Sequence, residues 1–235
     1  MGDRPTTLVV AAHPDDIDFG CAGTVARWVE DGVDVRYCVV TDGEAGGSDT
    51  AMSRTEMAEI RRAEQRAAAA VVGVTECVFL GHPDGRLQAS FELRRDITRV
   101  IRTVRPDRVL CHSPDRMYDI VAASHPDHLA AGEAALCAVY PDARNPFAHP
   151  ELAAEGLAPH VVREVWMMGA PGATSVTSTD EVADRKLAAL GCHRSQLADV
   201  DATFAAVRAW MAATAEEAGL SEGRLAEVFR VIDTV

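Results

Sequence analysis

The chain has 235 residues, of which 48% are hydrophobic and 25% charged, and its formal net charge is −13. These values exclude an intrinsically disordered chain, and the acidic excess argues against binding to nucleic acid or anionic lipid. The length favours one domain spanning residues 1–235. No apolar run approaches the roughly 20 residues that cross a bilayer, and the N-terminal residues do not read as a signal peptide. We therefore expect a cytoplasmic protein.

Short apolar segments alternate along the chain with longer amphipathic ones, which indicates alternating strands and helices. The predicted strands are residues 7–12, 33–41, 76–80, 108–111 and 161–168. The predicted helices are residues 20–31, 53–72, 91–104, 124–139, 180–190 and 202–218, with Ser124 as the N-cap of the fourth. This order predicts an α/β fold with a doubly wound, mostly parallel sheet and helices on both faces. Residues 140–160 are rich in Pro and Ala without a period, and we expect a long loop that overhangs the site.

Ligands of doubly wound sheets bind at the carboxyl ends of the strands, so the residues that follow each apolar run carry most information. Asp, His and Gly are frequent there beyond what turns require. The four segments are His13-Pro14-Asp15-Asp16, Thr41-Asp42-Gly43-Glu44, Gly81-His82-Pro83-Asp84-Gly85 and His112-Ser113-Pro114-Asp115.

The first of these segments has the residue types of a metal site. Pro14 fixes a tight bend, so His13 and Asp16 can face one cleft, and imidazole with carboxylate is a common ligand pair for a divalent transition metal. A third ligand is expected from Ser124-His125-Pro126-Asp127-His128. On a helix, His125 and His128 share one face, so that one could bind the metal while the other faces the substrate.

Other readings of these residues compete with a metal site. An isolated His-Pro-Asp is often only a turn, but two such motifs at one sheet edge favour a metal. The six cysteines are too widely spaced for a four-cysteine zinc site, and no G-x-S-x-G elbow supports a nucleophilic triad. Gly20-Cys21-Ala22-Gly23 lacks the dinucleotide-binding pattern.

Taken together, the motifs resemble those of the PIG-L/LmbE-like family of metal-dependent N-deacetylases, in order from about residue 7 to about residue 232. The pairing of the two His-Pro-Asp motifs is specific and the others support it. They are Ala12-His13-Pro14-Asp15-Asp16, Thr41-Asp42-Gly43-Glu44, Arg61-x-x-Glu64, Pro83-Asp84-Gly85, His125-Pro126-Asp127-His128 and His193-x-Ser195-Gln196. The resemblance implies a Rossmann-like fold, usually zinc, and removal of an acyl group from an amino sugar or a related conjugate.

The resemblance also implies a role for single residues. It assigns His13, Asp16 and His128 as metal ligands and Asp15 as the general base. It makes His125 the group that stabilises the oxyanion or protonates the leaving amine, with Asp127 orienting His125 and keeping it protonated. Arg61 matches a family arginine that contacts substrate, and Asp42 and Asp84 lie in matching motifs as further candidate substrate contacts.

The chain departs from the family pattern at two positions. Ile17 stands where the first motif commonly has Glu, which puts the groups around the ligands in question. Ala123 stands two residues before His125, where some members have a tyrosine that helps to hold the oxyanion.

Three functions remain open at the level of the sequence. The leading one is a zinc-dependent N-deacetylase or amidase that acts on a small-molecule N-acylated amino sugar. The alternatives are a metal-dependent phosphoesterase and a non-catalytic Rossmann-like binding protein. Zinc is favoured by the ligand set, although iron or another divalent ion would suit the same donors. The sequence leaves the acylated substrate and the oligomeric state open.

Overall fold

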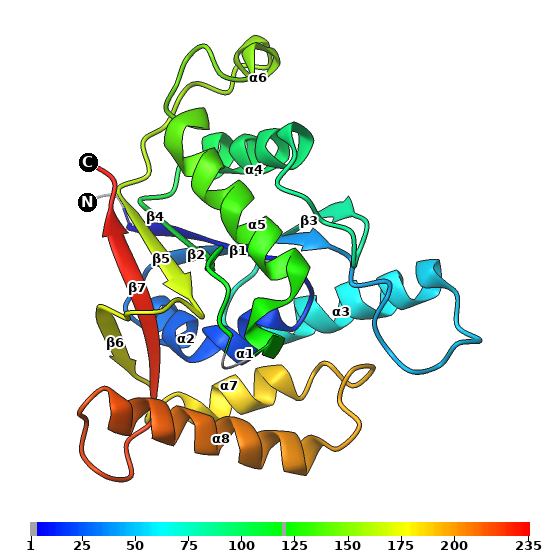
Figure 1. Ribbon diagram of the computed structural model, residues 1–235, viewed down its shortest axis with the longest axis vertical. Coiled ribbons are helices and arrows are strands. Elements are labelled where there is room, and N and C mark those ends of the chain that lie inside the picture. The colour runs from blue at the N-terminus through cyan, green and yellow to red at the C-terminus, as the bar shows by residue number, and fades with distance from the viewer. Residues whose placement is uncertain (1–3, 119–120) are drawn as a thin grey trace.

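The computed structural model describes residues 4–118 and 121–235, without the side chains of residues 122 and 123. Within these ranges seven strands form one sheet in the order β3-β2-β1-β4-β5-β7-β6 (Figure 1). Strands β1 to β5 run parallel to one another, whereas β7 runs antiparallel to β5 and to β6. The predicted mostly parallel α/β fold is confirmed. The strands are β1 (Thr6–Ala11), β2 (Asp34–Thr41), β3 (Cys77–His82), β4 (Arg108–His112), β5 (Glu164–Met168), β6 (Ser175–Ser178) and β7 (Ala226–Asp233).

Helices cover both faces of the sheet (Figure 1). They are α1 (Asp16–Gly20), α2 (Ala22–Glu30), α3 (Arg54–Val72), α4 (Phe91–Val104), α5 (Pro126–Cys137), α6 (Pro150–Ala154), α7 (Ala183–Leu190) and α8 (Val200–Glu217). Alternate residues of β1 face opposite sides: Leu8 and Val10 pack with α4 and α5, and Val9 and Ala11 pack with α2 and α3. In the described part of the chain, no helix is both long and apolar enough to cross a membrane.

Most predicted elements lie within a few residues of the observed ones, and the differences have local causes. The predicted helix 20–31 corresponds to α2, and the short helix α1, which was not predicted, precedes it and is separated from it by Cys21. The N-cap of α5 is His125, whose Nδ1 accepts the Asp127 N–H at 3.2 Å, so the assignment of Ser124 as N-cap is wrong. The Ser124 hydroxyl instead accepts from the backbone N–H of Met117. Strands β6 and β7 were not predicted.

The segment 140–160 lies away from the site, and the expectation that it overhangs the site is wrong. The buried guanidinium of Arg102 on α4 donates to the carbonyls of Asp142, Asn145 and Ala148. Nε2 of His160 lies 2.7 Å from the carbonyl oxygen of Pro106, just before β4 begins. The segment therefore packs beside the N-terminal ends of the strands, and α6 projects at the end of the molecule farthest from the start of α5 (Figure 1).

Candidate active site

The tight turn between β1 and α1 builds the first part of the site. The backbone N–H of His13 donates to Oδ2 of Asp16 at 2.7 Å, so the carboxylate folds back over the turn. Nδ1 of His13 lies 3.4 Å from the same oxygen. Both side chains are about nine-tenths buried. The His-x-x-Asp spacing therefore brings an imidazole nitrogen and a carboxylate together, as the sequence analysis expected.

The start of α5 brings His128 to the same point. Nε2 of His128 lies 3.0 Å from Oδ1 of Asp16, and its ring centroid is 5.3 Å from that of His13. His112, the last residue of β4, adds another imidazole: its Nε2 lies 3.1 Å from Oδ2 of Asp16, and its ring stacks on His128 at 4.2 Å. The structure therefore brings the three predicted ligands together and adds His112 beside them.

This donor set suits a divalent transition metal ion. Candidate ligand atoms of His13, His125 and His128 lie within 4.8 Å of one another, and so do those of Asp16, His112 and His128. Imidazole nitrogen and carboxylate oxygen are the ligands that zinc and related ions take in hydrolytic sites. Since the two sets share only His128, geometry alone leaves more than one choice of ligands.

Two further carboxylates fix the ring of His13. Nε2 of His13 lies 3.1 Å from Oδ1 of Asp84 and 3.1 Å from Oδ2 of Asp127. Burial lowers the pKa of His13, but Asp127, Asp16 and Asp84 outweigh it and raise that pKa to about 12. A ring that donates from Nε2 to carboxylates presents Nδ1 toward Asp16, which is the arrangement that orients a metal-binding histidine.

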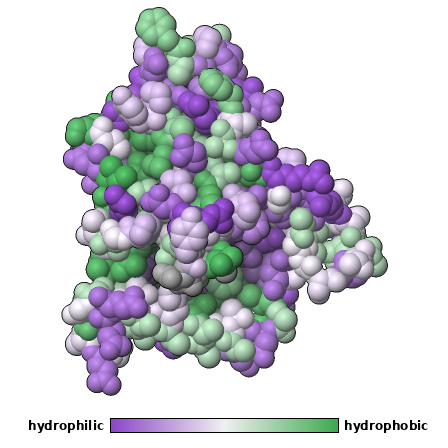
Figure 2. Space-filling model, viewed as in Figure 1, coloured by the Kyte–Doolittle hydropathy of each residue, from purple (hydrophilic) through white to green (hydrophobic). Residues whose placement is uncertain are grey.

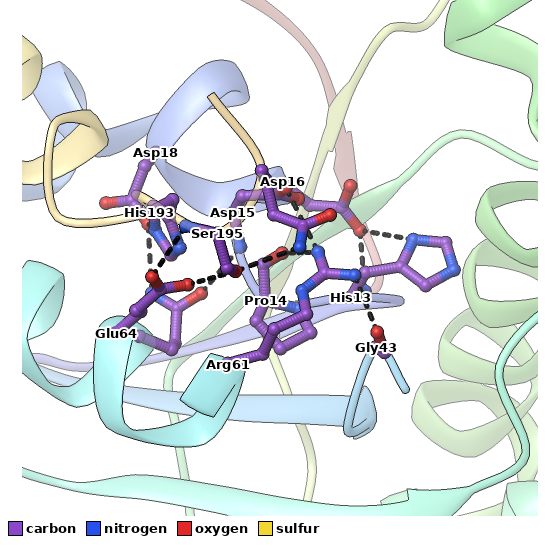
Figure 3. Close-up of polar contacts among 12 residues, drawn as sticks. His13, Pro14, Asp15, Asp16, Asp18, Gly43, Arg61, Glu64, His193 and Ser195 are labelled. Carbon is purple, nitrogen blue, oxygen red and sulfur yellow. Dashed lines mark hydrogen bonds and ion pairs between the residues drawn. The ribbon is translucent and has the colours of Figure 1, made fainter. Parts of the chain in front are cut away.

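Asp15 lies beside this cluster and is held by Arg61. Nη2 of Arg61 lies 3.0 Å from Oδ2 of Asp15 and also donates to the carbonyl of Pro14, while Nη1 donates to the carbonyl of Gly43 at 2.8 Å (Figure 3). Burial and the charge of Asp16 raise the pKa of Asp15 to about 6, although Arg61 opposes the shift. Asp15 is thus a carboxylate at neutral pH with more basicity than an exposed aspartate.

His125 is exposed and faces the same cluster, with its ring centroid 5.0 Å from that of His13. Its Nδ1 accepts the Asp127 N–H, so the proton of the neutral ring is on Nε2. Burial of the ring, followed by the charges of His13 and His128, lowers the pKa of His125. This shift disfavours the protonated ring that the sequence analysis expected.

The carboxylate of Asp127 does not contact His125, contrary to the expected orienting role. Its oxygens accept from the backbone N–H groups of Gly85 and Leu87 and from His13. The His125 ring accepts a hydrogen bond from the backbone N–H of Asp127, which fixes its orientation at the start of α5. Asp127 therefore connects the turn after β3 to the His13 ring.

The residues considered as substrate contacts occupy different environments. Arg61 is 4% exposed and uses both terminal nitrogens on protein oxygens, so the structure places it behind Asp15. Asp84 accepts the backbone N–H of Ala45 in addition to its contact with His13. Asp42 pairs with Arg62 at 2.6 Å, and this ion pair lies outside the histidine cluster. We therefore treat Arg61 and Asp84 as supports of Asp15 and His13.

The two departures from the family pattern differ in outcome. Ile17 is fully buried in the apolar cluster of α2, α3 and the sheet, so this position carries a core side chain. Ala123 is one of the positions whose side chain lies outside the described residues, and its consequence stays untested.

The contacts of several residues at the site could not be predicted, because they depend on packing between distant elements. His112 was expected only among the residues that follow a predicted strand, and that position was its only signal. Behind Asp15 lies a second buried group, which Figure 3 shows in part. It consists of Asp18 on α1, Gln65 on α3 and His193 after α7.

Comparison with known proteins agrees with this geometry. The family described as PIG-L, GlcNAc-PI de-N-acetylase, matches residues 8–139, which is more than half of the chain. A diacetylchitobiose deacetylase from Thermococcus kodakarensis is 33% identical over 83% of this chain and 72% of its own length. A probable N-acetyl-alpha-D-glucosaminyl L-malate deacetylase 2 from Bacillus cereus is 32% identical over 80% of this chain and 82% of its own.

The fold is also similar to that of a solved relative over nearly its whole length. The N,N'-diacetylchitobiose deacetylase from Pyrococcus horikoshii superposes with a TM-score of 0.90 at 29% identity, covering 98% of this chain and 85% of the other. The match therefore includes the strand ends that carry the His and Asp cluster. The chain belongs to the PIG-L family of hydrolytic N-deacetylases.

Proposed function

We propose that the protein is a zinc-dependent hydrolase that removes the N-acetyl group from a small molecule containing N-acetylglucosamine. The observation that carries the proposal is the convergence of His13, Asp16 and His128 at one point, with Asp15 beside them. Relatives named for N-acetylglucosamine-containing substrates support the choice of substrate class.

In this proposal His13, Asp16 and His128 hold the metal ion. When bound, such an ion would lower the pKa of a coordinated water toward about 7 and would polarise the acyl oxygen. Asp15 accepts the proton of the attacking water, which its raised pKa favours, and returns it to the leaving amine. Arg61 keeps the Asp15 carboxylate in place by its contact at 3.0 Å.

His125 supplies the second polar contact to the reacting amide. Because its Nδ1 accepts a backbone N–H, its Nε2 is the donor that remains for the developing oxyanion. A neutral imidazole that donates from Nε2 meets the requirement without a positive charge on the ring. The proposal therefore keeps the oxyanion-binding role for His125 and does not require a charged ring.

The proposal is tested by turnover with and without metal. We expect the zinc-loaded protein to release acetate from N,N'-diacetylchitobiose or an N-acetylglucosaminyl conjugate, and to lose turnover when a chelator removes the ion. Restoring zinc should restore the rate. A parallel series of phosphomonoesters and phosphodiesters is the control. Chelator-sensitive hydrolysis of phosphoesters without acetate release would contradict the proposal.

Metal binding should also release a proton from His13. In the metal-free protein the surrounding carboxylates raise the pKa of His13 to about 12, so both ring nitrogens carry protons at pH 7. A ligand nitrogen must be free of its proton, so zinc binding displaces at least about one proton per ion. Calorimetric titrations in two buffers of different ionisation enthalpy measure this number. Binding without buffer dependence would show that His13 is not a ligand.

A further inference from the structure

The backbone of Asp15 has an unusual conformation that needs support from outside the turn. Its φ is 99° and its ψ is −29°, a left-handed region that residues other than glycine rarely adopt. Because of this conformation, the side chains of His13, Asp15 and Asp16 can face the same cleft although they lie within four consecutive residues. A residue held in this way relaxes when the groups that fix its backbone are removed, and its side chain then moves.

Gln65 on α3 fixes that backbone directly. Its Oε1 accepts the N–H of Asp15 at 2.9 Å, and its side chain is fully buried. Arg61, one turn earlier on the same helix, fixes the Asp15 carboxylate and the Pro14 carbonyl. Helix α3 therefore holds both the backbone and the carboxylate of the proposed base, and Figure 3 shows Arg61 beside Asp15.

The orientation of the Gln65 amide is set by a second buried pair. Nε2 of Gln65 donates to Oδ2 of Asp18 at 2.9 Å, and Nε2 of His193 lies 2.8 Å from the same oxygen. Asp18 and His193 are both fully buried. An ionised carboxylate only accepts hydrogen bonds, so Asp18 attracts the NH2 group of Gln65 and leaves Oε1 facing Asp15. A reversed amide would set two donors against each other.

We propose that Gln65 is a positioning residue for Asp15 and that Asp18 and His193 act through it by orienting its amide. The inference rests on the proposed role of Asp15 as the base. None of the three side chains is exposed, so they act on the reaction through Asp15 and not by contact with substrate. Gln65 joins α3 to the turn after β1, and His193 brings the end of α7 into the same network.

The test compares two substitutions at Gln65 that differ in the atom facing Asp15. Gln65→Met removes the acceptor while it keeps the length of the side chain, and we expect kcat to fall about 10- to 100-fold with KM and metal content unchanged. Gln65→Glu keeps an oxygen for the Asp15 N–H but sets a second carboxylate against Asp18. It should lose more thermal stability than Gln65→Met and yet keep the higher kcat. The proposal would be overturned if Gln65→Met, the variant expected to be more stable, also had the higher kcat.

Controls separate this inference from the proposed function. Thr98→Val removes a fully buried hydroxyl on α4 and should change neither kcat nor the Asp15 amide. In the metal-free protein, hydrogen exchange at the Asp15 N–H should be faster in Gln65→Met than in the parent, which needs no turnover. Unchanged exchange would refute the positioning role, whereas a parent protein without deacetylase activity would refute only the proposed function. If Gln65→Met does not fold, His193→Phe should lower kcat at constant KM, and a parental kcat would overturn the proposal.

Discussion

Replacing Asp15 by asparagine is expected to lower kcat by about 100- to 10,000-fold while the purified protein keeps its metal. Asparagine has the size of aspartate and tolerates positive φ, so the turn should persist at φ 99°. Its amide oxygen can still accept from Arg61, but the side chain has no basic oxygen to take a proton from water. The loss should therefore fall on kcat, with metal content and thermal stability close to those of the parent.

The matched control for this substitution is Asp96→Asn on α4. Asp96 also pairs with an imidazole and a guanidinium, since it lies 3.1 Å from Nε2 of His82 and 2.9 Å from Arg95. Its change removes the same charge from a place outside the histidine cluster. We expect parental kcat for this variant, measured by acetate release. Equal turnover of Asp15→Asn and the parent would remove Asp15 from the role of base.

The centre of the candidate site could be predicted because its signals are local. The His13-x-x-Asp16 spacing depends on one tight turn, and His128 belongs to a second motif at the start of a helix. The rule that parallel strands end at one edge then predicts that the two motifs meet, although His13 and His128 are 115 positions apart in the sequence. The distances to Asp16 confirm that the three side chains converge. Their role as metal ligands stays a proposal.

The supporting residues could not be predicted because their partners are distant in the sequence. Arg61 was matched to a substrate contact, but the packing of α3 against the turn after β1 directs it to Asp15. The network of Gln65, Asp18 and His193 depends in the same way on the packing of α3, α1 and the segment after α7 against one another. A sequence motif shows that a polar residue stands at a fixed position in the chain. Only the fold determines which atom its side chain contacts.

Strand β7 was missed for a related reason. Its eight residues include charged side chains, and Glu227 among them is buried, which a pattern of apolar residues does not indicate. Glu227 pairs with the fully buried Lys186 on α7 at 2.7 Å and accepts the N–H groups of Gly23 and Thr24. A buried charge is tolerated only with such partners, and these come from two other elements. The chain thus has a strand whose hydrophobic pattern is interrupted by a paired charge.

The ligand assignment gives the second large expected effect. We expect the zinc affinity to fall strongly in His13→Ala and in His128→Ala. Removing a residue that only hydrogen-bonds to a ligand costs roughly 10- to 100-fold in metal affinity, and each of these variants should lose more than that. Each should also lose turnover at substoichiometric zinc. The measurement is zinc per protein after dialysis against a weak chelator, together with acetate release on adding back zinc. Each variant removes one imidazole, so the remaining ligands are too few to hold the ion against the chelator.

The competing imidazoles make this experiment decisive between ligand sets. His112→Asn and His125→Ala remove side chains that also lie within ligand distance of the cluster. If the ligands are His13, Asp16 and His128, the His125 variant keeps its zinc and loses kcat, because only the donor to the oxyanion is gone. The His112 variant removes a side chain that lies 3.1 Å from Asp16. Its zinc affinity should fall by no more than the roughly 10- to 100-fold expected for a residue that supports a ligand. Retention of zinc by the His13 variant together with its loss from the His112 variant would instead favour Asp16, His112 and His128 as the ligands. Asp15 would still lie next in sequence to the ligand Asp16, so this outcome would overturn the ligand assignment without removing Asp15 from the role of base.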